Sequence, residues 1–170
     1  MKTHPFIAAL PNDDKTLKEM SKIAPKSQKF RYIMMDSGAS LNAADIDVHF
    51  PEYKQLLRES EGQRKGEFAY TANGQKLFNK GEFDVHGECN DTPLSLCFTN
   101  VKVDAPIASV RRFVQAGCKV IFEHGGGHIV DEKSGARINF LEIGRVYFLK
   151  YKIKQPTSHN KPPAFGRQAP

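Results

Sequence analysis

The most chemically suggestive stretch of the chain is Asp36-Ser37-Gly38-Ala39-Ser40. It follows the mostly apolar run Phe30–Met35 and therefore places one carboxylate in a turn at the end of a predicted strand. Gly38 lets such a turn close without a Cβ clash, and its small neighbours let another backbone segment approach. A carboxyl group presented in this way is a candidate for general acid–base chemistry. The alternative is an ordinary turn in which Asp36 only accepts hydrogen bonds from neighbouring amides.

Other reactive residue types form weaker patterns. His124-Gly125-Gly126-Gly127-His128 has a spacing that metals tolerate, but no cysteine or acid is suitably placed, so a glycine-tipped β-hairpin is expected instead. Ser37, Ser40 and Cys118 would each need a histidine base that the sequence does not place beside them. The sequence therefore predicts neither a metal site nor a cofactor.

Composition favours a one-domain intracellular protein. The chain has 170 residues, of which 39% are hydrophobic and 26% charged. No stretch approaches the roughly 18 apolar residues of a membrane span, and the apolar run Ile7–Leu10 is too short for a signal peptide. Cys89, Cys97 and Cys118 lie far apart, so reduced, buried thiols are expected.

The formal net charge of +6 belongs to the C-terminal end of the chain. No acidic residue follows Glu142, and the segment after it carries Arg145, Lys150, Lys152, Lys154, Lys161 and Arg167, which equal the whole excess (25 − 19). Such a segment could make a weak nucleic-acid contact, but it lacks the interleaved aromatic residues of a stacking surface. We expect residues 154–170 to form a basic, Pro-rich, disordered tail.

Residue patterns elsewhere predict a mostly β domain. Residues 1–29 read as a short helix and a linker, and the folded domain is expected over residues 30–153. The strongest hairpin signal is Asn73-Gly74 between the predicted strands 67–72 and 75–78, the second of which is expected to continue through 81–87. The region 59–66 reads as a charged loop. Further strands are expected at 94–103, 119–123, 127–130, 136–141 and 145–153, with one helix at 109–117.

The Asp-Ser-Gly-Ala turn after a hydrophobic run resembles the active-site turn of the retropepsin-like aspartic peptidases. The later pattern sharpens this resemblance: an Ile-Ala-Ser-Val step into a helix ending Gln-Ala-Gly, a Val-Ile-Phe strand, an Ile-Val-Asp-Glu-Lys-Ser-Gly segment and a terminal Arg-Val-Tyr-Phe-Leu. Together they are similar to the peptidase region of Copia-type retrotransposon polyproteins and to related retropepsin-like genes of protists. The likeness runs from about Tyr32 to Tyr151. Retropepsins usually carry two apolar residues and a Gly before the late helix, whereas this chain has Ile107-Ala108-Ser109, and the Copia-type sequences also have a Ser there.

The resemblance implies an acid-protease barrel with one short late helix, a flap hairpin and an added N-terminal helix. It implies Asp36 as the catalytic residue, within an active-site turn of Ser37, Gly38 and Ala39. The flap, which closes over a bound peptide, would be formed by Tyr70, Thr71, Ala72, Asn73, Gly74 and Gln75.

Two carboxyl groups are needed for this chemistry, and the chain has a single Asp-Ser-Gly. Asp131 is the nearest second candidate, but two charged residues separate it from Ser134-Gly135, so we expect an exposed turn there. The sequence thus predicts a homodimer in which each copy supplies one Asp36, acting as an aspartic endopeptidase on a peptide or polyprotein. The alternative is an inactive domesticated copy that serves as a dimerisation, nucleic-acid or protein interaction module.

Overall fold

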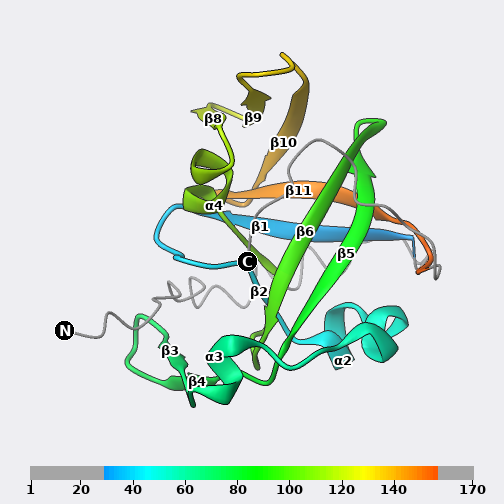
Figure 1. Ribbon diagram of the computed structural model, residues 1–170. Helices are drawn as coiled ribbons and strands as arrows, with labels where there is room; N and C mark the ends of the chain where they lie inside the picture. The colour runs from blue at the N-terminus through cyan, green and yellow to red at the C-terminus, as the bar shows by residue number, and fades with distance from the viewer. Residues whose placement is uncertain (1–28, 157–170) are drawn as a thin grey trace.

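The computed structural model describes residues 29–156, which form a closed β-barrel with few short helices (Figure 1). Six strands close the barrel in the order β1-β7-β2-β6-β5-β11, because β11 pairs back with β1. The predicted all-β class is confirmed. Strands β10, β9 and β8 extend the sheet outward from β11. No helix within the described residues is long and apolar enough to cross a membrane.

The elements are numbered along the chain, and Figure 1 labels most of them. The barrel strands are β1 (Phe30–Asp36), β2 (Ala43–Ala44), β5 (Glu82–Cys89), β6 (Thr92–Asn100), β7 (Ile107–Ser109) and β11 (Val146–Ile153). The extension consists of β8 (Cys118–Glu123), β9 (Gly126–Asp131) and β10 (Arg137–Ile143). The remaining elements are α2 (Ile46–His49), the 3₁₀ helix η1 (Pro51–Leu56), α3 (Glu61–Arg64), β3 (Phe68–Tyr70), β4 (Lys76–Phe78) and α4 (Val110–Gln115).

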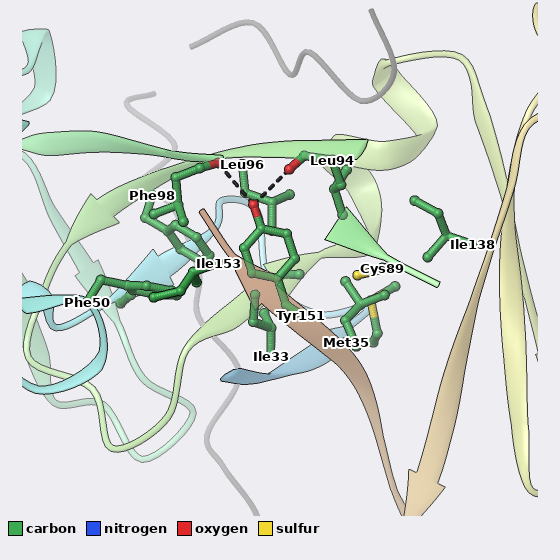
Figure 2. Packing of buried hydrophobic residues seen from close by; sticks show 14 of the residues in the cluster. Ile33, Met35, Phe50, Cys89, Leu94, Leu96, Phe98, Ile138, Tyr151 and Ile153 are labelled. Atoms are coloured by element: carbon green, nitrogen blue, oxygen red, sulfur yellow. Dashed lines mark hydrogen bonds between the residues drawn. The ribbon is translucent and has the colours of Figure 1, made fainter. Parts of the chain in front are cut away.

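The barrel interior is filled by the alternating apolar residues of its strands. β5 shows the pattern most clearly, since every second residue from Phe83 to Cys89 is buried. Figure 2 shows Tyr151 in the middle of this cluster, between Leu94 and Ile33. The Tyr151 hydroxyl lies 2.7 Å from the carbonyl oxygen of Leu94 and 3.1 Å from that of Val85, so the one polar atom of this side chain is satisfied inside the core. Burial raises the pKa of Tyr151 well above its ordinary value.

Gly87 makes room for this tyrosine. A Cβ at this position would meet the Lys152 carbonyl oxygen at 2.3 Å and the Tyr151 ring at 2.6 Å, distances that real Cβ atoms do not show. Two strands therefore approach each other closely at the point where β5 meets β11, and the absence of a side chain on Gly87 permits it.

A second, smaller cluster of buried residues lies outside the barrel and is the one that matters for the candidate site. It joins residues of β1, β7 and β11 to the two-stranded sheet of β3 and β4: Met34, Ala39, Ala43, Ala69, Leu77, Val101, Ile107 and Phe148. The β3–β4 hairpin is thus packed against the region where β1 ends.

Several expected elements differ in detail from those observed. The hairpin strand that ends at Phe78 does not continue into β5, because β3 and β4 form their own sheet and β5 belongs to the barrel. The chain turns between them at Gly81, whose φ is +108°. The charged region 59–66 is not all loop, since Ser60 caps α3 by accepting the Gln63 amide at 3.0 Å. The predicted N-terminal helix and most of the predicted tail lie outside the described residues.

Candidate active site

Asp36 is the last residue of β1, and the following turn leads across the end of the barrel into β2. β1 runs parallel to β7, with Asp36 in register with Ser109. Ser109 is also the N-cap residue of α4, because its side chain accepts the Arg112 amide at 3.3 Å. One carboxylate is therefore held between the end of a strand and the start of a helix.

The two oxygens of the Asp36 carboxyl group have different surroundings. Oδ1 accepts a hydrogen bond from the Gly38 amide at 2.7 Å. Oδ2 is buried and has no hydrogen-bond partner among the described residues. Partial burial raises the pKa of Asp36, while the amides of Gly38 and Ala39 act in the opposite direction. The site therefore makes ionisation of this carboxyl group less favourable, and it leaves one carboxyl oxygen without a partner among the described residues.

Two buried polar side chains hold the turn in place. The Ser109 hydroxyl donates to the Ala39 carbonyl oxygen at 2.6 Å. Asn42 bridges two strands: its Oδ1 accepts the Ser109 amide at 2.8 Å, and its Nδ2 donates to the Cys97 carbonyl oxygen at 3.0 Å. Each of these bonds links segments more than 50 residues apart in the sequence. The position of Asp36 is therefore set by the tertiary fold as well as by its local turn.

The other predicted turn residues differ in exposure. Ser37 and Gly38 are exposed, whereas Ala39 is buried. Ala39 belongs to the smaller cluster together with Ala69 of β3 and Leu77 of β4. The structure thus brings the predicted catalytic turn and the base of the predicted flap together in one packed cluster.

The predicted flap residues form the tip of the β3–β4 hairpin. Tyr70 ends β3 opposite Lys76, and the loop between them is closed by the Thr71 amide, which donates to the Gln75 carbonyl oxygen at 3.0 Å. The remaining residues, Ala72, Asn73 and Gly74, are exposed at its tip. The loop is longer than the two-residue Asn-Gly turn expected from the sequence, and only Gly74, with φ +83°, has the left-handed conformation.

A cavity of about 380 Å³ opens beside the base of this hairpin. Its apolar wall includes Leu41, which follows the Asp36 turn, and Phe68, Ala69 and Leu77 of the hairpin. Its other wall is polar and is lined by residues before and within α3, by Asn79, Glu82 and Thr99, and by Arg112 of α4. The cavity is large enough to receive one amino-acid side chain.

Asp131, the second candidate carboxylate in the sequence, differs from Asp36 because both of its carboxyl oxygens have hydrogen-bond partners. Its Oδ1 accepts the Lys133 amide at 2.9 Å and its Oδ2 accepts the Ser134 hydroxyl at 2.8 Å. These hydrogen bonds lower the pKa of Asp131, and the turn that follows is exposed. Asp131 stabilises the β9–β10 connection, as the sequence predicted.

The other candidate groups are the two histidines of the glycine-rich segment and the three cysteines. His124–His128 lies at the predicted hairpin between β8 and β9, and the described residues include no group of three or more side chains arranged to hold a metal ion. The three cysteines are free thiols, two of them buried. Burial raises the pKa of the Cys89 and Cys97 thiols to about 12, which leaves them largely protonated and poorly nucleophilic at neutral pH.

Asn42 was not identified from the sequence, and Ser109 was placed only at the start of a predicted helix and in the Ile-Ala-Ser step of the resemblance. A signal for Ser109 existed, because a serine between a buried strand and a helix can cap the helix and still reach the neighbouring strand. Asn42 offered no comparable signal, since both of its partners come from strands distant in sequence.

The described part of the chain is thus an all-β barrel with a half-buried carboxyl group at the end of β1 and a hairpin packed beside it. Comparison with protein-family models, with curated proteins and with solved structures gives no significant match.

Proposed function

We propose that this protein is an aspartic endopeptidase of the retropepsin-like class, active as a homodimer in which each copy contributes Asp36. The observation that carries the proposal is the buried, unpartnered Oδ2 of Asp36. An unpaired buried polar atom costs a folded protein about 1–3 kcal/mol, so its presence calls for a partner that residues 29–156 of one copy do not supply. A second Asp36 carboxyl group, related by a two-fold axis, supplies that partner.

The electrostatics of Asp36 agree with this role. Two carboxylates in contact cannot both be ionised, so such a pair holds one proton between them, as in aspartic proteases generally. The raised pKa of Asp36, caused mainly by burial, means that ionisation of this carboxyl group is already less favourable than in an ordinary Asp before the second copy approaches. Asp131, whose pKa is lowered by hydrogen bonds to its carboxylate, has no such tendency.

The reaction follows from the shared proton. The ionised Asp36 takes a proton from a water molecule that lies between the two carboxyl groups, and the water oxygen attacks the carbonyl carbon of the peptide bond. The protonated Asp36 of the other copy gives its proton to the carbonyl oxygen, which forms a neutral gem-diol. The Asp36 that took the proton of the water then protonates the nitrogen, and the other, now ionised Asp36 takes a proton from a hydroxyl of the gem-diol. The C–N bond breaks, and the products are a carboxylic acid and an amine. Neither a covalent enzyme intermediate nor a metal takes part in this proposed route.

The residues around Asp36 support these steps in different ways. The Gly38 amide orients one oxygen of the carboxyl group, and the other oxygen has no partner among the described residues. The exposed Ser37 is available for a hydrogen bond to the second copy, and buried Ala39 supports the turn from beneath. The hairpin tip from Tyr70 to Gln75 would close over the peptide and exclude water from the reacting bond.

The substrate class is an extended, unfolded peptide, in keeping with the processing of a polyprotein. A hairpin that covers the site admits one strand of peptide, and the cavity beside its base would receive one of the side chains. The cavity has both carboxylates and guanidinium groups in its polar wall, among them Glu67 and Arg112.

The test compares cleavage of an unfolded protein by the wild-type chain and by the Asp36→Asn variant at about pH 4 to 6, the range in which such carboxyl pairs hold one proton. We expect the wild type to cleave and the variant to be inactive. Asp131→Asn is the matched control, since it makes the same chemical change at an exposed turn and should leave cleavage unchanged. Absence of cleavage by a verified wild-type dimer would contradict the proposal and favour an interaction module.

A further inference from the structure

Strand β8 is an edge of the extended sheet. It pairs with β9 along its whole length, from Cys118 to Glu123, and among residues 29–156 no strand pairs with its other edge. Two large apolar side chains on this strand are exposed: Ile121 at 36% and Phe122 at 40%. An edge that carries exposed apolar residues and unpaired backbone groups is a template for another strand.

β8 has few of the features that usually prevent an edge strand from pairing with another chain. The strand contains no proline, and its charged residues stand near its ends, Lys119 and Glu123. Lys119 pairs with Glu132 at 2.7 Å, but both side chains are more than half exposed, so this ion pair contributes little and is easily exchanged. The central part of the edge, Val120–Phe122, is apolar.

Symmetry restricts how two copies of this edge can pair. In an antiparallel pair, two residues that face each other either both direct their N–H and C=O groups toward the partner strand or both direct them away from it. This direction alternates from one residue to the next along a strand. When the two strands are identical, a residue can therefore face only itself or a residue an even number of positions away. The two-fold axis must then pass between the two copies of one residue.

The charges select which residue lies on the axis. With the axis at Ile121, Lys119 of each copy faces Glu123 of the other, and Val120 faces Phe122. Both ends of the pairing are then opposite-charge pairs, and a β-branched residue meets an aromatic ring on the opposite face. Phe122 already packs against Phe140 and Tyr147, with ring centroids 5.3 and 4.9 Å away, so the second copy would extend an existing aromatic cluster. An axis at a neighbouring residue would place a charged side chain opposite Ile121.

We propose that β8 pairs antiparallel with β8 of a second copy about a two-fold axis at Ile121, and that this surface assembles the dimer; the inference rests on the proposed function. The same helix connects the two regions, since α4 begins beside the Asp36 turn and ends just before β8 (Figure 1). Its six residues span about 9 Å. The proposal requires that the two-fold axis set by the β8 pairing also passes between the two Asp36 residues.

The test uses charge reversal at the two ends of the edge, with the mass in solution measured by analytical ultracentrifugation. Lys119→Glu alone and Glu123→Lys alone each place like charges opposite each other twice, so each should raise the dimer Kd about tenfold or more. An equimolar mixture of the two variants should dimerise again, because every facing pair is then of opposite charge. The double variant should also dimerise. Lys133→Glu, the same charge change in the turn after β9, is the control and should leave the Kd unchanged.

Wild-type Kd values for both single variants would overturn the proposal and would mean that something other than a second copy covers this edge. Failure of the mixture to dimerise would also overturn it, and recovery in the mixture shows that both variants fold. The assembly does not depend on catalysis, so Asp36→Asn should dimerise as the wild type does. Loss of cleavage in Asp36→Asn with no effect of the β8 variants would leave the proposed function standing and reject this interface alone.

Discussion

The hydroxyl of Ser109 donates a hydrogen bond to the carbonyl oxygen of Ala39 across 2.6 Å, and this bond ties the start of α4 to the turn that carries Asp36. Ser109 is fully buried, and its hydroxyl oxygen also accepts the Arg112 amide in the first turn of the helix. A single side chain therefore stabilises a helix end and the candidate catalytic turn, so fold and proposed activity are coupled at this residue.

Replacement of Ser109 by alanine should affect both properties. The Ser109→Ala variant loses the helix cap and leaves the Ala39 carbonyl oxygen unpaired, and we expect the free energy of unfolding to fall by about 1–3 kcal/mol. Cleavage should fall further than the loss of folded protein explains, because the Asp36 turn loses its support. Chemical denaturation and cleavage rates measure the two effects. Ser134→Ala, which removes an exposed turn hydroxyl, should change neither by more than a small amount.

The bridge made by Asn42 predicts a pH-dependent loss of stability. Asn42→Asp keeps the acceptor for the Ser109 amide but sets a second oxygen against the Cys97 carbonyl oxygen, in a site that is 3% exposed. Burial disfavours the ionised form, so the variant should be closest to wild type at low pH and less stable by about 2 kcal/mol or more at neutral pH. Urea denaturation at acid and neutral pH measures this difference. If the stability difference between Asn42→Asp and the wild type were the same at both pH values, the site of Asn42 would tolerate a charge, and Asn42 would not bridge the strands as described.

The raised pKa of Asp36 predicts that this residue destabilises the monomer at neutral pH. Since the folded state favours the protonated carboxyl group, the stability that Asp36 contributes is present below its ordinary pKa of 3.8 and is lost as the pH rises through the higher pKa of the folded state. The Asp36→Asn variant should therefore melt at a higher temperature than the wild type at neutral pH, and the difference should shrink toward low pH. Thermal unfolding at concentrations where both proteins are monomeric measures it. A wild type more stable than the variant at neutral pH would reverse the inferred sign of the shift.

The hairpin tip offers a test of the flap with a closely matched control. Gly74 and Gly66 both have positive φ, +83° and +63°, and an added Cβ meets nothing within 4 Å at either position. Alanine at either site should cost about 1 kcal/mol of backbone strain. Gly74→Ala should in addition weaken peptide cleavage, mainly through KM, because it stiffens and reshapes the tip. Equal effects of Gly74→Ala and Gly66→Ala on KM would argue that the tip does not touch the substrate.

The sequence predicted the fold class because alternating apolar residues and turn signals are local features. Most of the strands, the helix that begins after Ser109 and the exposed turn after Asp131 follow from patterns a few residues long. The short barrel strands β2 and β7 were not predicted. The short helix α3 was missed because its four residues carry no apolar periodicity. The closing pair of β1 and β11 joins residues more than 100 positions apart, and a pattern within one strand does not specify its neighbour.

The candidate site was predicted in part for the same reason. Asp36 and its turn are contiguous, so they can be recognised from sequence, and the hairpin was placed by Asn73-Gly74. The bonds that Asn42 and Ser109 make across the fold depend on tertiary contacts. The unpaired Oδ2 of Asp36 depends on burial, which a local sequence pattern does not reveal.

The central claim, that activity requires one Asp36 from each of two copies, is tested most directly by mixing. Wild type and Asp36→Asn are combined in varying proportion at a fixed total concentration well above the dimer Kd, and cleavage of an unfolded protein is measured. If only dimers with two Asp36 residues are active, the rate should fall with the square of the wild-type fraction, because mixed dimers are inactive. A rate that falls linearly with that fraction would mean that each copy acts alone, and it would contradict an active site shared between two copies.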